Sequence, residues 1–242
     1  YLTFFVVAAV YFMVAAHGNW SAGSAHERRG RWYFILAAIM VGLAIGSKFT
    51  AVLLSLPLLW TAAAADVPGR RRYWALLGIV VAALAFALTN PFAVLDWTCT
   101  PPSTGGGESW LPATLSKSCY IQNILTQNAM VSGRTDLGFT RQYAGTIPYV
   151  YFGEMLVRWG LGLLLGLMAL AGLVVSTWDV ARSLRGAAGI NEALQRLLRQ
   201  PVVVVLLWVL PYLLLTGGFY VKFLRYMQPI APFLILFGAA LL

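Results

Sequence analysis

Two cations, Lys222 and Arg225, lie three residues apart in GFYVKFLRYMQPIAPF, residues 218–233, directly before an apolar run. In a helix they would share one face, where their mutual repulsion would favour an anion between them. A planar guanidinium binds phosphate oxygens in pairs, and a lysine amine adds a mobile point charge. We therefore predict that they bind the phosphate or pyrophosphate of a lipid-linked substrate. The alternative is that both side chains reach out to lipid headgroups.

Further polar residues border other apolar runs, at what would be the same membrane boundary. Lys48 lies between two such runs in GLAIGSKFTAVL, and we predict that it also binds the phosphate. TNPFAVLDW and SGRTDLGFTRQYAGTIPY follow later in the chain. Together with the first stretch they supply the candidate substrate-binding residues Asn90, Asp96, Arg134, Asp136, Gln142, Tyr143 and Tyr226.

Several of these residues also have a purely structural interpretation. Lys48 could reach the outer headgroups. Asn90 could simply end a helix, because Pro91 restricts the residue before it. Asp96 could pair with a loop cation, and Asp136 could pair with Arg134 or Arg141. Such exposed pairs would contribute under about 1 kcal/mol.

Other chemistries find little support in these residues. The only histidines, His17 and His26, have no cysteine nearby, so we predict no metal site. No Walker loop or Rossmann glycine pattern is present, and we predict no cofactor. The glycines of LGLLLGLMALAG are typical of helix packing in membranes.

The elements that position these residues must lie in a membrane. The chain is 60% hydrophobic and 10% charged, with a mean hydropathy of +0.76, whereas soluble domains carry about 25% charged residues. Continuous apolar runs favour helices over a β-barrel. We predict an all-α, polytopic transmembrane helix bundle in the cell membrane, forming one domain over residues 1–242. Its seven apolar segments are 1–16, 32–46, 49–65, 74–89, 157–177, 202–217 and 227–242.

The net charge of +9 comes largely from arginines in short loops, which indicates the positive-inside pattern and not nucleic-acid binding. Loops 17–31, 66–73 and 178–201 would then be cytoplasmic, the last with a short amphipathic helix in NEALQRLLRQP. Residues 90–149 would form one long extracytoplasmic loop, in which YIQNILTQNAM could be a helix. Tyr1 and Leu242 both lie within apolar runs, so we expect the chain to be a fragment.

Two cysteines, Cys99 and Cys119, fall in the long outer loop, on the oxidising side. A disulfide between them would stabilise the fold by about 3 kcal/mol in the chain-entropy model. Two free thiols are the alternative.

Four stretches, GLAIGSKFTAVLLSLPLLW, TNPFAVLDW, QYAGTIPYVYFGEMLVRWGLG and VKFLRYMQPIAP, resemble the protein O-mannosyltransferase-like enzymes of glycosyltransferase family 39, which have the GT-C fold. The resemblance implies a transferase that moves a sugar from a polyprenyl-phosphate carrier to a protein, lipid or glycan acceptor on the extracytoplasmic face. It implies that Lys48, Lys222 and Arg225 lie near the carrier phosphate. Arg134, Gln142 and Tyr143 would be sugar or acceptor contacts. The family's catalytic acid follows its first span, so we expect it before Tyr1.

Two other classes of function remain open. The chain could belong to a transporter or flippase of a lipid-linked or anionic solute, since outer cations would suit one. It could also be a non-catalytic membrane subunit that binds lipid carriers. Acidic residues upstream would favour the enzyme, and an inverted repeat of the spans would favour the transporter.

Overall fold

In a computed structural model, the described residues, 1–21, 26–65, 71–99, 117–135 and 137–242, form helices and connecting segments, without a strand among them. The prediction of an all-helical fold is confirmed for this part of the chain. The helices of one turn or more are α1 (Leu2–Ser21), α2 (Glu27–Ser47), α3 (Ser55–Ala63), α4 (Arg71–Thr89), α5 (Pro91–Leu95), α6 (Cys119–Val131), α7 (Val150–Met155), α8 (Leu163–Ser183), α9 (Ile190–Leu198), α10 (Val202–Gly217) and α11 (Ala231–Ala239). Short 3-10 helices are η2 (Phe49–Leu54), η4 (Arg141–Tyr143) and η6 (Leu224–Tyr226), and η5 (Leu156–Gly160) is a π-helix.

Helix length supports fewer membrane spans than the seven predicted. Four described helices, α1, α2, α4 and α8, are long and apolar enough to cross a membrane. A fifth span is possible if α9 and α10, bent by 98° at their junction, count as one. The segment 49–65 is divided between η2 and α3, and α11 in 227–242 has nine residues. At 1.5 Å per residue, α11 covers about half of a hydrocarbon core. The described part of the chain therefore has four to five candidate spans, which indicate a membrane-embedded helical protein.

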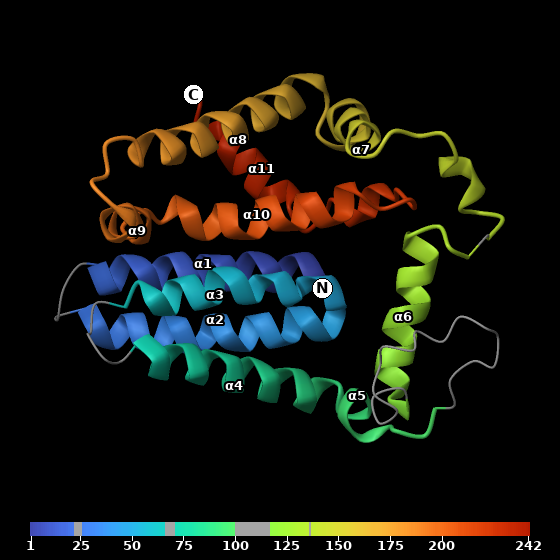
Figure 1. Cartoon of the computed structure of the whole chain (residues 1–242), viewed down its shortest axis with the longest axis horizontal. Coiled ribbons are helices and arrows are strands. Elements are labelled where there is room, and N and C mark those ends of the chain that lie inside the picture. Colours follow the sequence, from blue (N-terminus) through green and yellow to red (C-terminus); the bar gives the residue numbers. More distant parts are fainter. Residues whose placement is uncertain (22–25, 66–70, 100–116, 136) are drawn as a thin grey trace.

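The helices form two groups that meet along α10 (Figure 1). Helices α1 to α4 lie side by side in the first group, while α8, α10 and α11 form most of the second. Close approach within each group depends on glycine. A Cβ on Gly42 of α2 would come within 2.3 Å of the Ala82 carbonyl of α4, and one on Gly172 of α8 within 2.0 Å of the Phe237 carbonyl of α11. Only a residue without a side chain lets these backbones approach so closely.

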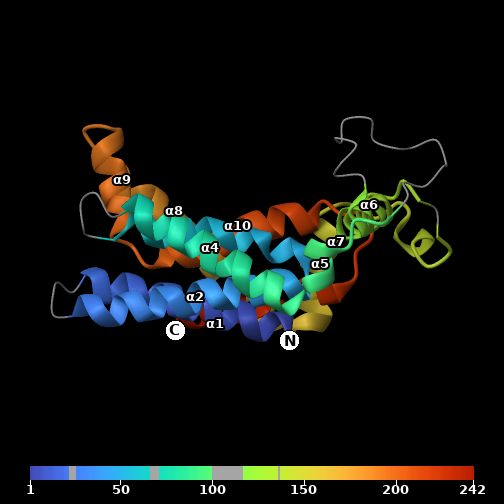
Figure 2. The same cartoon turned by 90° about the horizontal axis from the view of Figure 1, so that it is seen from below.

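The two ends of the bundle carry different elements. At one end, called the α9 end, α8 leads into α9 and α10 begins (Figures 1 and 2). At the other, called the α6 end, α2 meets η2, α4 meets α5, and α6 runs across the helix ends. The stretch YIQNILTQNAM is therefore helical as part of α6, and α9 lies in NEALQRLLRQP. Predicted site residues from distant parts of the chain thus come together at the α6 end.

We predict opposite effects on stability for two glycine-to-alanine substitutions. Gly42→Ala should lower the free energy of unfolding by about 1–3 kcal/mol, because the added methyl group would push α2 and α4 apart. Gly18→Ala should raise it by up to about 1 kcal/mol, because nothing lies within 4 Å of that position and alanine favours the helix. Thermal unfolding of both variants in one detergent checks this. Equal shifts would contradict the packing of α2 on α4.

Candidate functional site

A cavity of about 670 Å³ opens at the α6 end of the bundle. Residues 45–50, where α2 ends and η2 begins, form one wall. A face of α6 forms a second wall, and Leu215, Phe219 and Tyr226 from the C-terminal part close a third side. The cavity is large enough for a small organic ligand, since such sites measure about 300–1,000 Å³.

Two cations from separate segments face the ring of Tyr226. The Lys48 amine lies 4.0 Å from the ring centroid and the Arg225 guanidinium carbon lies 6.0 Å from it. The Lys48 backbone is extended between α2 and η2, and its N–H donates to the Ala44 carbonyl, so the helix end fixes where this side chain begins. We call Lys48 and Arg225 the cation pair. Each gains from the ring's negative face.

The cation pair has no carboxylate partner among the described residues. Within the part of the chain that the structure describes, neither Lys48 nor Arg225 has an acidic group within 4.0 Å. Burial, followed by the charge of Arg225, lowers the pKa of Lys48 to about 8. A bound anion would offset both effects by favouring the charged amine. The site therefore has positive charge in excess and favours an anionic ligand.

Lys222 does not line this cavity. It is 3% exposed, and its amine donates to the Thr146 hydroxyl at 2.9 Å and to the Tyr220 carbonyl at 3.1 Å. Burial lowers the pKa of this amine. The premise that Lys222 and Arg225 share a helical face is wrong, because the backbone becomes helical only at Leu224. Lys222 instead joins the segment before η6 to the one after η4.

Asn90 and Asp96 make local contacts near the cavity. The Asn90 amide donates to the Thr89 hydroxyl at 3.0 Å and lies against Gly46, where a Cβ would come within 2.2 Å of it. Because α4 ends at Thr89, Asn90 also marks a helix end. The Asp96 carboxylate accepts from the Thr98 hydroxyl at 2.7 Å and from its N–H at 3.2 Å, which fixes a turn.

Three further predicted contacts, Arg134, Gln142 and Tyr143, do not line the cavity. Gln142 is exposed and donates to the Phe139 carbonyl. Tyr143 is buried with its ring against Tyr151 and Phe223. Arg134 is exposed just beyond the end of α6, and Asp136 lies outside the described residues. Of the sequence-predicted residues, Lys48 and Tyr226 line the cavity, and Arg225 stands beside them.

The wall that sequence reasoning missed is α6. Its cavity-lining residues include Tyr120, Asn123, Ile124, Gln127, Asn128 and Val131. Helical spacing of Tyr120, Asn123 and Gln127 within YIQNILTQNAM is the signal that could have revealed a shared face. What the sequence could not show is that this face turns toward Lys48.

Both ends of α6 are held. At its start, a disulfide joins Cys119 to Cys99, with their Cα atoms 5.0 Å apart, and the Cys119 N–H donates to the Asp96 carbonyl. At its end, the Val131 carbonyl accepts from the N–H groups of Tyr220 and Val221. The helix that forms this wall of the cavity is therefore fixed at both ends.

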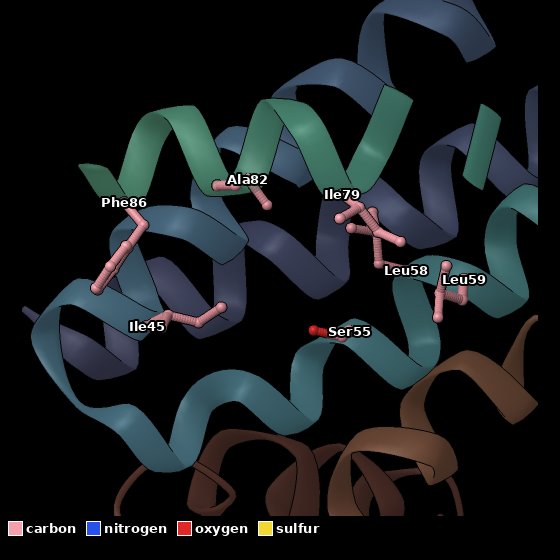
Figure 3. A pocket seen from close by; sticks show the side chains of 8 residues that line it. Ile45, Ser55, Leu58, Leu59, Ile79, Ala82 and Phe86 are labelled. Atoms are coloured by element: carbon pink, nitrogen blue, oxygen red, sulfur yellow. The ribbon is translucent and has the colours of Figure 1, made fainter. Parts of the chain in front are cut away.

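A separate apolar pocket of about 190 Å³ lies within the first helix group (Figure 3). It lies between α2, α3 and α4, and Ile45 lines both spaces. Phe86 lines the pocket, and its ring lies 5.5 Å from that of Tyr120 in the cavity wall. In Figure 3, Ile45 and Phe86 lie at one end of the pocket and Leu59 at the other. The pair of spaces thus offers a charged end and an apolar end.

In the described ranges, no group of three or more His, Cys, Asp or Glu side chains lies close enough together to hold a metal ion.

The buried amine of Lys222 gives a test of the site's framework. Thr146→Val should lower the free energy of unfolding by about 1–3 kcal/mol, because it leaves a buried ammonium short of one acceptor. The exposed Thr126→Val on α6 is the control, and we expect a change within about 0.5 kcal/mol. In a Lys222→Met background the cost of Thr146→Val should shrink. Thermal unfolding measures all four variants, and an undiminished cost in that background would contradict the contact.

In comparisons with known proteins, no family model, curated protein or solved structure matches this chain. The likeness to glycosyltransferase family 39 therefore stays a prediction from the four quoted stretches.

Proposed function

We propose that this chain is part of a membrane glycosyltransferase of the GT-C type that takes its sugar from a polyprenyl-phosphate carrier. The observation that carries the proposal is the cation pair without a carboxylate partner in the described residues, next to a cavity at the helix ends. The seven apolar segments of the sequence, some of them short or broken helices, would form the GT-C bundle.

The cavity and the apolar pocket, which share Ile45 as a lining residue, suit the two parts of such a lipid. Its phosphate would lie against Lys48 and Arg225, and the first isoprenoid units would enter the apolar pocket between α2, α3 and α4. Transfer of the sugar leaves negative charge on the carrier phosphate. Cations already in place stabilise this charge most in the transition state, where it develops.

The described cavity lining supplies binding groups but no carboxylate that could act as general base. None of these lining residues is Asp or Glu. The base that takes the acceptor's proton would therefore come from another part of the protein, as the family resemblance implies. The same observation favours a second candidate function, a membrane subunit that binds the carrier lipid without transferring its sugar.

Removing the cation pair should strongly weaken carrier binding. In Lys48→Gln/Arg225→Gln, the affinity for polyprenyl phosphate in nanodiscs should fall at least about 100-fold, since each charge-assisted contact contributes about 1.5–3 kcal/mol. Arg182→Gln/Arg185→Gln is a matched control, because these two cations also share one aromatic ring, Trp178, at the α9 end. Equal affinities of the two double variants would refute the proposed site. Release of labelled sugar from polyprenyl-phosphate hexose by membranes then separates the enzyme from the binding subunit.

Binding should also weaken as the pH rises through about 8. Lys48 is charged below its pKa of about 8 and neutral above it. A sugar phosphodiester keeps its single charge across this range, so only the amine changes. From about pH 7 to about pH 9.5 we expect affinity for polyprenyl-phosphate hexose to fall about tenfold. Lys48→Arg should remove this dependence, because arginine stays charged. A flat wild-type profile would contradict the role of Lys48.

A further inference from the structure

Three amide side chains of α6 line the same cavity as the cation pair. Asn123 and Gln127 lie one helical turn apart, Asn128 follows Gln127, and all three line the cavity. None of the three makes a side-chain hydrogen bond within the part of the chain that the structure describes. Each amide therefore offers two N–H donors and one carbonyl acceptor to a ligand.

The composition of α6 is unusual for an exposed helix. All three amides are exposed, yet none of the thirteen residues of CYIQNILTQNAMV is charged. A helix face that only meets water commonly carries charged pairs that support it. Neutral groups that both donate and accept instead match a ligand that is itself neutral and does the same.

Aromatic rings flank the amides. Tyr120 and Tyr226 line the cavity together with Phe49 and Phe219. Tyr120 is held by ring contacts with Phe49 at 6.5 Å and with Phe86 at 5.5 Å. Burial raises the pKa of the Tyr120 phenol, which stays neutral and able to donate. An aromatic face packs against the C–H face of a sugar ring, while the amides reach its hydroxyl groups.

We infer that this face of α6 binds a neutral hexopyranose. The cavity also holds Lys48, so a sugar on α6 would lie next to an anion on the cation pair. That adjacency, and with it the identification of the hexose as the sugar of the lipid-linked donor, rests on the proposed function. The contact between α6 and a hexose does not, because it depends only on the amides and rings. A sugar bearing a carboxylate would compete with the phosphate for the cation pair, so a neutral sugar fits this wall better.

Saturation-transfer NMR with the purified full chain in detergent tests the inference without any lipid. Methyl hexopyranosides are the probes, because weak binding suffices for a signal. At least one of them should bind the wild type and bind at least about tenfold more weakly to Asn123→Ala/Gln127→Ala/Asn128→Ala, which loses several hydrogen bonds. Gln127→Ala alone is the milder second variant, with an expected loss of about threefold. Thr126→Ala/Ser132→Ala/Gln228→Ala removes three polar groups that do not line the cavity, and it should bind as the wild type does.

Each outcome bears on one of the two proposals. Hexoside binding that is lost in the amide variants but kept in Lys48→Gln/Arg225→Gln supports a sugar site on α6, even if carrier lipid fails to bind. No hexoside signal in the wild type, or equal binding by the amide and control variants, overturns the inference. So does amide-dependent binding of a serine- and threonine-rich peptide without any hexoside signal, which would assign this face to an acceptor. Carrier-lipid binding that is unchanged in Lys48→Gln/Arg225→Gln refutes the proposed function but leaves the sugar site on α6 standing.

Discussion

A hydrogen bond between two buried tyrosines determines where the candidate site lies. The hydroxyl of Tyr212, in the middle of α10, donates to the Tyr226 carbonyl at 3.0 Å. One helical turn earlier, the Trp208 indole donates to the Pro229 carbonyl at 3.4 Å. Both carbonyls belong to the short stretch between α10 and α11, outside any α-helix, where backbone groups lack regular partners. These bonds hold η6 against α10, and η6 carries Arg225 and Tyr226 to the cavity.

The positions of the basic residues follow from that arrangement. Arg225 leaves η6 toward the exposed side, where its guanidinium packs 4.4 Å from the Phe223 ring. Lys222 precedes η6 and turns inward to oxygen acceptors. A buried ammonium needs such acceptors, because an unpaired charge in a protein interior costs several kcal/mol. Lys222 and Arg225, three positions apart, therefore have different roles. Lys222 joins two segments of the chain, and Arg225 lies beside the cavity.

Several features of the fold could be predicted from particular residues. The apolar runs before Lys48 and before Asn90 are helices because their continuous hydrophobic residues favour burial in lipid. Pro91 coincides with the break between α4 and α5. The run 227–242 was predicted as one apolar segment, but its helix begins only at Ala231, after Gln228 and Pro229, and covers Ala231–Ala239. Local chemistry predicted each break better than it predicted helix length.

By itself, the sequence indicated the membrane environment of this protein, its all-helical class and the types of polar residue that border its apolar runs. These features depend on local composition and on proline positions. Only the tertiary structure decided which of those residues meet. Lys48 and Tyr226 are 178 positions apart and come within 4.0 Å through the ring contact that packing creates. The cavity wall on α6 depends on how that helix crosses the bundle end, which its disulfide and its contact with Tyr220 impose. Such long-range contacts depend on the packing of whole helices, and no local spacing encodes them.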